Sequence, residues 1–309
     1  NSIIYIMIQI YERRNAMSNS DIRAKATVIR EQTDGMITLF LAPVLISFLS
    51  GVAEFGLKQI WGQTGTFSWG TTIVKDGVTW THNFISVGPS IIFDFIAQCL
   101  IVTACFQLIR LVRKQRTKVN FTECFTLLDG KNFLPVFSTT LLKMLVLYLA
   151  SFPAALGMIL IGLAFYSTIV IFGAPIDYQP DFSAFFSSSY FQTGLILVCV
   201  GITCSLFVGY GLSQVSFLLY DYLENNTYSS PFKLFSQSWQ LMKGNKWRRF
   251  LLDLSFIGWF IGVLLTFGFL GLYVYPYYWT CQTIFYEDLK AKNPLMFSTY
   301  KSVISSTVA

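Results

Sequence analysis

Long apolar stretches are the feature of this 309-residue sequence that most limits what it can fold into. Each is at least as long as the roughly 20 residues that a helix needs to cross a bilayer. Charged residues make up only 12% of the chain, whereas a soluble domain carries about 25%. This pattern excludes a disordered chain, a coiled coil and an ordinary soluble enzyme, and it predicts an all-α polytopic membrane protein. The stretches are residues 36–55, 88–109, 134–173, 190–222 and 250–289.

The basic residues set the predicted number of spans. One group, at 110–118, follows the second apolar stretch, and another, at 243–249, precedes the last. The positive-inside rule places both groups in the cytoplasm, so an even number of spans must lie between them. The stretches 134–173 and 190–222 therefore count as one span each.

Two further features complete the predicted count of spans. Pro153 is expected to break or kink the helix over 134–173, because its ring clashes with the preceding turn. The stretch 250–289 is long enough for two spans and is predicted to divide near Gly268 and Gly271. Six transmembrane helices result, with both termini cytoplasmic and 19 of the 22 Lys and Arg on that side.

The clearest of three predicted cytoplasmic amphipathic helices covers residues 231–243. Ser230 is a good N-cap, Pro231 occupies the first helical position, and Gly244 ends the helix. Such a helix lies in the membrane interface, with its apolar face toward lipid and its basic residues near anionic headgroups. The residues predicted to anchor it are Phe232, Phe235, Trp239, Met242 and Trp247.

Two earlier segments repeat this plan of an amphipathic helix, a glycine and an apolar stretch. They are residues 120–129, ended by Gly130, and, more faintly, residues 21–34, ended by Gly35 and with Ile22, Ala26 and Ile29 as the apolar positions. The functional interpretation is lipid sensing or partner docking, and the alternative is a surface anchor that sets the register of the spans. Membrane lipids with anionic headgroups are the expected partners, with a membrane protein as a second expectation.

The predicted organisation is an N-terminal extension (1–19), a single membrane domain (20–290) with units of about 20–110, 119–222 and 230–289, and a cytoplasmic tail (291–309).

Ionisable residues inside the apolar stretches are the candidates for a functional polar site, because each costs several kcal/mol unless it is paired or hydrated. Lys143 lies near the middle of its predicted span, and Asp94 and Asp253 lie inside neighbouring ones. One interpretation pairs Lys143 with an acid, preferably Asp94, because Asp253 can pair with Arg249. The alternative is a structural ion pair, or a lysine that snorkels to the interface. Asp221, at a span end, is expected to be reached by water.

Two local patterns predict packing and a turn. The spacing Gly258-x-x-x-Gly262 lets two helices approach closely, either within the chain, which we favour, or between two copies. The predicted outer loop, 56–87, contains two β-like runs around Asp76-Gly77, which is typical of a short β-hairpin.

Motifs of catalysis and metal binding are missing. The sequence contains no P-loop, no G-x-S-x-G and no H-E-x-x-H, and its single histidine, His82, cannot supply a site that needs two imidazoles. The six cysteines show no C-x-x-C spacing and are expected to be free thiols. We therefore expect no catalytic, cofactor-binding or metal-binding residues.

The favoured function is a non-enzymatic accessory or scaffold role at the lipid interface. The alternatives are a transporter or permease for a small or amphipathic solute, and an intramembrane lipid-modifying enzyme.

Strings in the C-terminal half carry a resemblance to a known family. They are QVSFLLYDY (214–222), SWQLMKGNKWRRF (238–250), DLSFIGW (253–259) and PYYWTCQTIFYEDL (276–289). These strings resemble the uncharacterised bacterial integral membrane proteins grouped as domain-of-unknown-function family 975. The resemblance covers roughly residues 20–290 and implies a multi-pass protein of the bacterial plasma membrane. It supplies no catalytic residues.

Overall fold

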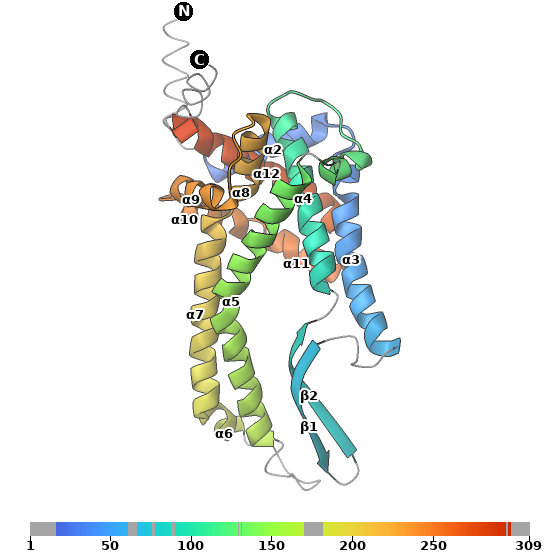
Figure 1. The fold of residues 1–309 in the computed structure, drawn as a ribbon, viewed down its shortest axis with the longest axis vertical. Helices are drawn as coiled ribbons and strands as arrows, with labels where there is room; N and C mark the ends of the chain where they lie inside the picture. Colours follow the sequence, from blue (N-terminus) through green and yellow to red (C-terminus); the bar gives the residue numbers. More distant parts are fainter. Residues whose placement is uncertain are drawn as a thin grey trace, which may run out of the picture. The chain divides into compact units, whose positions relative to one another are not determined.

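The computed structural model describes residues 17–60, 67–75, 78–87, 90–128, 130, 132–169, 182–294 and 296–297. Over these ranges the chain forms helices and one pair of antiparallel strands (Figure 1). The elements are α2 (Asn19–Gln32), α3 (Met36–Ile60), β1 (Phe67–Lys75), β2 (Val78–Val87), α4 (Ser90–Val112), the 3₁₀ helix η2 (Phe121–Leu128), α5 (Phe133–Ile169), α6 (Phe182–Ser187), α7 (Ser189–Gly211), α8 (Val215–Glu224), α9 (Pro231–Leu241), α10 (Lys246–Leu254), α11 (Ile257–Leu265) and α12 (Gly271–Lys292).

The chain divides into two compact units, and the division cuts across several long helices. Unit 1 gathers the described residues up to Phe48, those of Asp94–Leu141 and those from Tyr210 onward. Unit 2 gathers the described residues of Leu49–Phe93 and Leu142–Gly209.

The core of unit 1 includes apolar residues of α3 and α4. Leu39 and Phe40 of α3 are at most 1% exposed, and Ala104 and Leu108 of α4 are fully buried. Cys124 of η2 belongs to the same core and is also fully buried. The predicted amphipathic segment 120–129 is thus held partly by protein, as a 3₁₀ helix.

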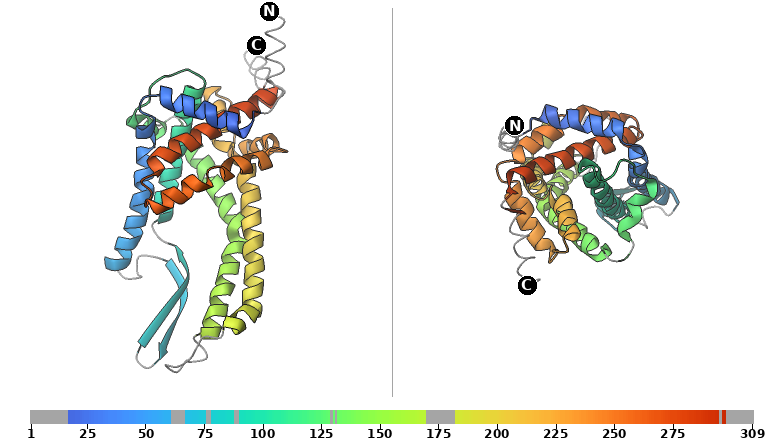
Figure 2. Two further views of the ribbon diagram at one scale, coloured as in Figure 1. Left: turned by 180° about the vertical axis from the view of Figure 1, so that it is seen from behind. Right: turned by 90° about the horizontal axis from the view of Figure 1, so that it is seen from above.

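Helix α2 lies along α12 within unit 1, as Figure 2 shows. A capping box fixes its start, because the Ser18 side chain accepts from the Asp21 amide and the Asp21 carboxylate accepts from the Ser18 amide. Ile22 and Ala26, on the face predicted to meet lipid, are fully buried. The prediction of a membrane-facing apolar side for residues 21–34 is therefore wrong at these two residues, which pack inside the protein.

All three predicted glycine stops have a positive φ, which residues with a side chain rarely adopt. The angle is 84° at Gly35, 88° at Gly130 and 80° at Gly244. A side chain at Gly35 would also collide with the carbonyl oxygen of Val119, whose amide donates to the carbonyl of Asp34 over 3.2 Å. The positive φ is found at all three glycines, but α2 ends earlier than predicted, at Gln32 with Thr33 as its extended C-cap, so Gly35 lies in the turn before α3. The threefold repeat stays a prediction.

In unit 2, α5 and α7 pack side by side through small residues (Figure 1). A Cβ atom on Gly157 would lie 2.5 Å from the carbonyl oxygen of Gly194, and one on Gly201 would collide with Ala154. Such close backbone approach is typical of helix pairs in membranes. Helix α5 continues through Pro153, so the predicted break is absent, and the alternative of a kink stays a prediction. One helix covers most of 134–173.

The strands β1 and β2 also belong to unit 2 and pair antiparallel, with Lys75 opposite Val78. The register shifts between Trp69 and Gly70. The predicted turn at Asp76-Gly77 lies outside the described residues.

The C-terminal stretch, predicted to form two helices, forms three: α10, α11 and α12. Helices α10 and α11 have nine residues each and are separated at Ser255 and Phe256. The turn between α11 and α12 contains Gly268, with φ 93°, and Gly271 begins α12. The predicted division near these two glycines is confirmed.

Three helical segments in the described part of the chain are long and apolar enough to cross a membrane. They are Ile91–Val112, Phe133–Phe165 and Ser189–Glu224. The segment Met36–Leu49 is apolar but shorter. The structure thus shows a chain with membrane-span-like helices, and the count of six stays a prediction.

Candidate functional site: a buried ion network

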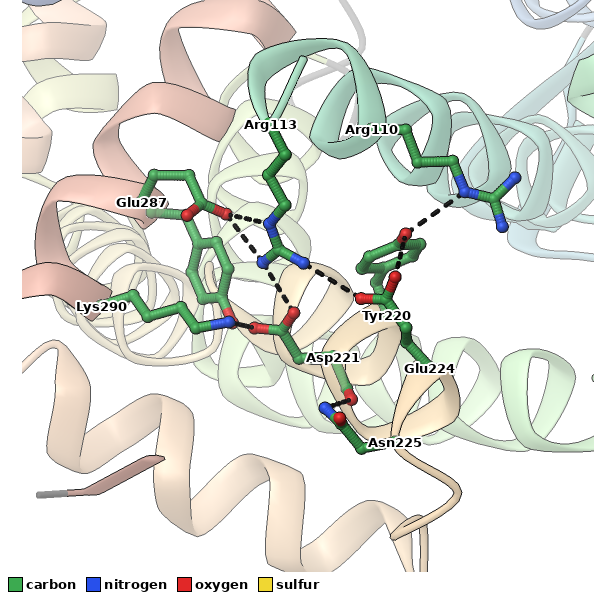
Figure 3. A network of polar contacts seen from close by, with 9 residues as sticks. Arg110, Arg113, Tyr220, Asp221, Glu224, Asn225, Glu287 and Lys290 are labelled. Atoms are coloured by element: carbon green, nitrogen blue, oxygen red, sulfur yellow. Dashed lines mark hydrogen bonds and ion pairs between the residues drawn. The ribbon is translucent and has the colours of Figure 1, made fainter. Parts of the chain in front are cut away.

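The most concentrated polar feature of unit 1 is an ion network at the end of α4, on α8 and on α12 (Figure 3). Arg113, just beyond α4, is its centre. Its Nη2 atom lies 2.7 Å from Asp221 Oδ1 and 2.8 Å from Glu287 Oε1, and its Nη1 atom lies 3.1 Å from Glu224 Oε2. One guanidinium therefore ties α8 to α12.

The second carboxylate oxygen of Asp221 is also occupied. It accepts from the Tyr286 hydroxyl and from Lys290 Nζ, each at 2.5 Å. The Asp221 residue is only 4% exposed. The prediction that water reaches Asp221 is wrong, because α12 and Arg113 cover it.

Helical spacing explains why these groups meet. Phe217 and Asp221 are four residues apart on α8, and Tyr286 and Lys290 are four apart on α12, so each pair lies on one face of its helix. The rings of Phe217 and Tyr286 stack with centroids 5.3 Å apart. The apolar contact thus places the acid of one helix against the hydroxyl and ammonium of the other.

The network continues outward along α8. Tyr220 donates from its hydroxyl to Glu224 Oε1 over 3.1 Å and accepts from Arg110 Nε over 3.2 Å. Burial alone would lower the pKa of Arg113, but the adjacent Asp221 and Glu287 carboxylates outweigh it and raise that pKa above its ordinary value. The described network has three bases and three acids, so its charges balance.

A second buried cluster contains Asp253, one of the predicted site residues. Its carboxylate lies 3.4 Å from Arg249 Nε and accepts from the Tyr278 hydroxyl at 3.1 Å and from Gln282 Nε2 at 2.8 Å. Arg249 is 4% exposed. The predicted pairing of Asp253 with Arg249 is confirmed, and α12 supplies the other two partners.

A third ion cluster ties the start of α2 to α10 and α12. Arg248 Nη1 lies 2.7 Å from Asp288 Oδ2, and Lys292 Nζ lies 2.9 Å from the same oxygen. Arg248 also donates to the carbonyl of Met17 over 2.6 Å. The clusters share α12, so that helix is the common support of the polar interior of unit 1.

The other two predicted polar residues, Lys143 and Asp94, belong to different units. Asp94 is exposed and Lys143 is half-buried. Their pairing stays a prediction.

The glycine pair on α11 does not pack two helices of unit 1 together. A Cβ atom on Gly258 would meet no atom within 4 Å, and one on Gly262 would lie 2.8 Å from Leu270 in the following turn. The prediction of intramolecular packing is wrong for Gly258. Glycines instead bring α5 and α7 close together, although neither helix contains a G-x-x-x-G spacing.

The predicted interfacial anchors divide into exposed and buried residues. Phe232 and Trp247 are 69% and 68% exposed, Trp239 is 37% exposed and Phe235 is half-buried. Met242 is fully buried, so its assignment as a lipid anchor is wrong. It follows Leu241, which with Leu234 and Ser238 forms the protein-facing side of α9.

Sequence reasoning missed the network around Arg113. Asp221 and Arg113 lie at the ends of long apolar stretches, where charges are ordinary, so sequence alone gave no reason to pair them. The sequence signal that could have indicated this network is the i, i+4 spacing of an aromatic and a charged residue, which occurs in both α8 and α12.

All six cysteines are free, as predicted. No cluster of three or more His, Cys, Asp or Glu able to hold a metal occurs among the residues that the structure describes.

A family model described as "Protein of unknown function (DUF975)" matches residues 17–293, which is most of the chain. The chain belongs to the DUF975 family. The match confirms the resemblance read from the C-terminal strings, and it includes α2 to α12 and thus all three ion clusters. No curated protein and no solved structure matches the chain.

Proposed function

We propose that this DUF975 chain is a multi-pass membrane protein with a non-enzymatic accessory or scaffold role at the lipid interface. The observation that carries the proposal is the apolar surface of α5 and α7. Only 6% of the most apolar window of α5 is buried, and Leu149 and Ile196 are 74% and 64% exposed. Exposing so much apolar surface to water is unfavourable, whereas lipid solvates it.

The proposed topology has six spans, with both termini in the cytoplasm of a bacterial plasma membrane. Its support is the position of 19 of the 22 Lys and Arg in the segments assigned to the cytoplasm.

Thiol labelling tests this topology. In a cysteine-free background, Phe182→Cys should react with a membrane-impermeant maleimide added to intact cells, and Gln115→Cys should react only after the cells are opened. Reaction of Cys at 182 only from the cytoplasmic side would refute the topology. Failure of the chain to stay in the pellet after sodium-carbonate extraction would refute membrane integration altogether.

The buried charges support an accessory role over transport. The carboxylate of Asp221 is already bound by Arg113, Tyr286 and Lys290. That of Asp253 is bound by groups of α10 and α12. Groups that satisfy one another hold helices together and offer little to a passing solute, since each would first have to lose its partner.

The role is tested by chemical cross-linking in native membranes, followed by mass spectrometry. An accessory protein should give the same stoichiometric protein partner in repeated preparations. A purified chain whose melting temperature rises with one class of small solute, and which carries that solute into liposomes, would establish the rival role of transporter.

A further inference from the structure

The segment of residues 225–252, which runs from the end of α8 into α10, combines positive charge with exposed aromatic rings. Residues 225–252 contain five Lys and Arg and no Asp or Glu. Arg248 and Arg249 pair with the acids Asp288 and Asp253. The three lysines lie nearer the surface: two are exposed and one is half-buried. With two exposed aromatic residues they define the basic-aromatic surface, which consists of Phe232, Lys233, Lys243, Lys246 and Trp247.

Contacts on the opposite side of α9 position the part of this surface that α9 carries, Phe232 and Lys233. Ser238 is fully buried, donates to the carbonyl of Gly211 over 2.7 Å and accepts from the amide of Gln214. The ring of Trp239 lies against Gly211, where any side chain would collide with it. Helix α9 is thus seated on the junction of α7 and α8, which fixes the direction of its outer face.

Aromatic rings also position the basic residues. Lys246 Nζ lies 3.6 Å from the centroid of the Trp239 ring, a cation–π distance, and Lys233 Nζ lies 5.9 Å from that of Tyr222. Trp247 stacks on Phe250 with centroids 5.0 Å apart and still exposes 68% of its surface. Lysines and exposed aromatic residues therefore occur together in this segment.

We propose that the basic-aromatic surface binds the headgroups of anionic phospholipids. The ammonium groups contact lipid phosphate, and Phe232 and Trp247 enter the boundary between headgroups and acyl chains. The proposal rests on the proposed membrane location and adds to it a defined lipid class and a defined site. Charge selects the occupant, because a surface with three lysines and no acid attracts anionic lipid and gains nothing from a zwitterionic one, while exposed Trp is typical of the bilayer interface.

The test measures lipid preference on the purified full-length chain. The protein in mild detergent is incubated with equal amounts of phosphatidylglycerol and phosphatidylcholine, re-purified, and its retained lipids are quantified by mass spectrometry. We expect the wild type to retain mainly phosphatidylglycerol. Each lysine near an anionic surface contributes about fivefold to binding, so the triple variant Lys233→Gln/Lys243→Gln/Lys246→Gln should lose at least about tenfold of that preference.

A matched control separates this surface from net charge. The variant Lys25→Gln/Lys114→Gln/Lys118→Gln removes an equal number of charges from exposed positions outside this surface and should keep the preference. The variant with Arg at positions 233, 243 and 246 should keep it as well, which shows that charge rather than misfolding is responsible. Equal loss in the two Gln variants, or no preference in the wild type, would overturn the proposal. Sodium-carbonate extraction tests the membrane location independently. A chain that stays in the membrane pellet but shows no lipid preference would refute this inference and leave the proposed membrane location intact.

Discussion

Replacing Asp221 with Asn tests whether the ion network holds α4, α8 and α12 together. The change removes a charge that is 2.7 Å from Arg113 and 2.5 Å from Lys290, and the Asp221 side chain is only 5% exposed. Removing one partner of a buried ion pair costs about 3–5 kcal/mol. Because Arg113 keeps Glu287 and Glu224, we expect the lower end, about 3 kcal/mol. That corresponds to a fall of about 6 °C in the melting temperature.

The assay is thermal unfolding of the purified chain in detergent, followed by size-exclusion chromatography of heated samples. Glu224→Gln is the control, because that side chain is 41% exposed and its ion pair contributes about 1 kcal/mol or less. The double variant Arg113→Met/Asp221→Asn should cost less than the sum of the two single variants, since both charges then leave together. Strict additivity, or a melting temperature for Asp221→Asn within about 1 °C of wild type, would refute the reasoning.

Three other predictions follow from the glycines and from Lys143. Gly201→Leu should abolish a monodisperse elution peak because α5 leaves no room at Ala154, whereas Gly258→Leu, with nothing within 4 Å, should elute as wild type does. Gly35→Ala should lower the melting temperature, since it combines a positive φ with a collision at Val119; a stable variant would contradict that contact. Lys143→Met should leave membrane insertion intact, because the change removes a charge from an apolar helix; a smaller share of the chain in the pellet after sodium-carbonate extraction would contradict this.

Local sequence patterns predicted most of the long helices and several of the turns between helices. Apolar runs and basic flanks predicted the regions of α3, α4, α5 and α7, and glycines predicted the turns that contain Gly35, Gly130, Gly244 and Gly268. Both signals are local, because helix length follows from apolar composition and a left-handed residue follows from the absence of a side chain. The Asp253–Arg249 pair could be predicted for the same reason, since four residues on one helix separate its members.

Tertiary structure decided which polar and small residues meet. Arg113, Asp221 and Glu287 are more than 60 residues apart in sequence, and each is an ordinary charge at a helix end until α12 brings them together. The same packing buries Ile22 and Met242, whose spacing had suggested contact with lipid. An amphipathic helix has the same pattern whether its apolar face meets lipid or protein, because both remove it from water. Only the position of the neighbouring helix tells them apart.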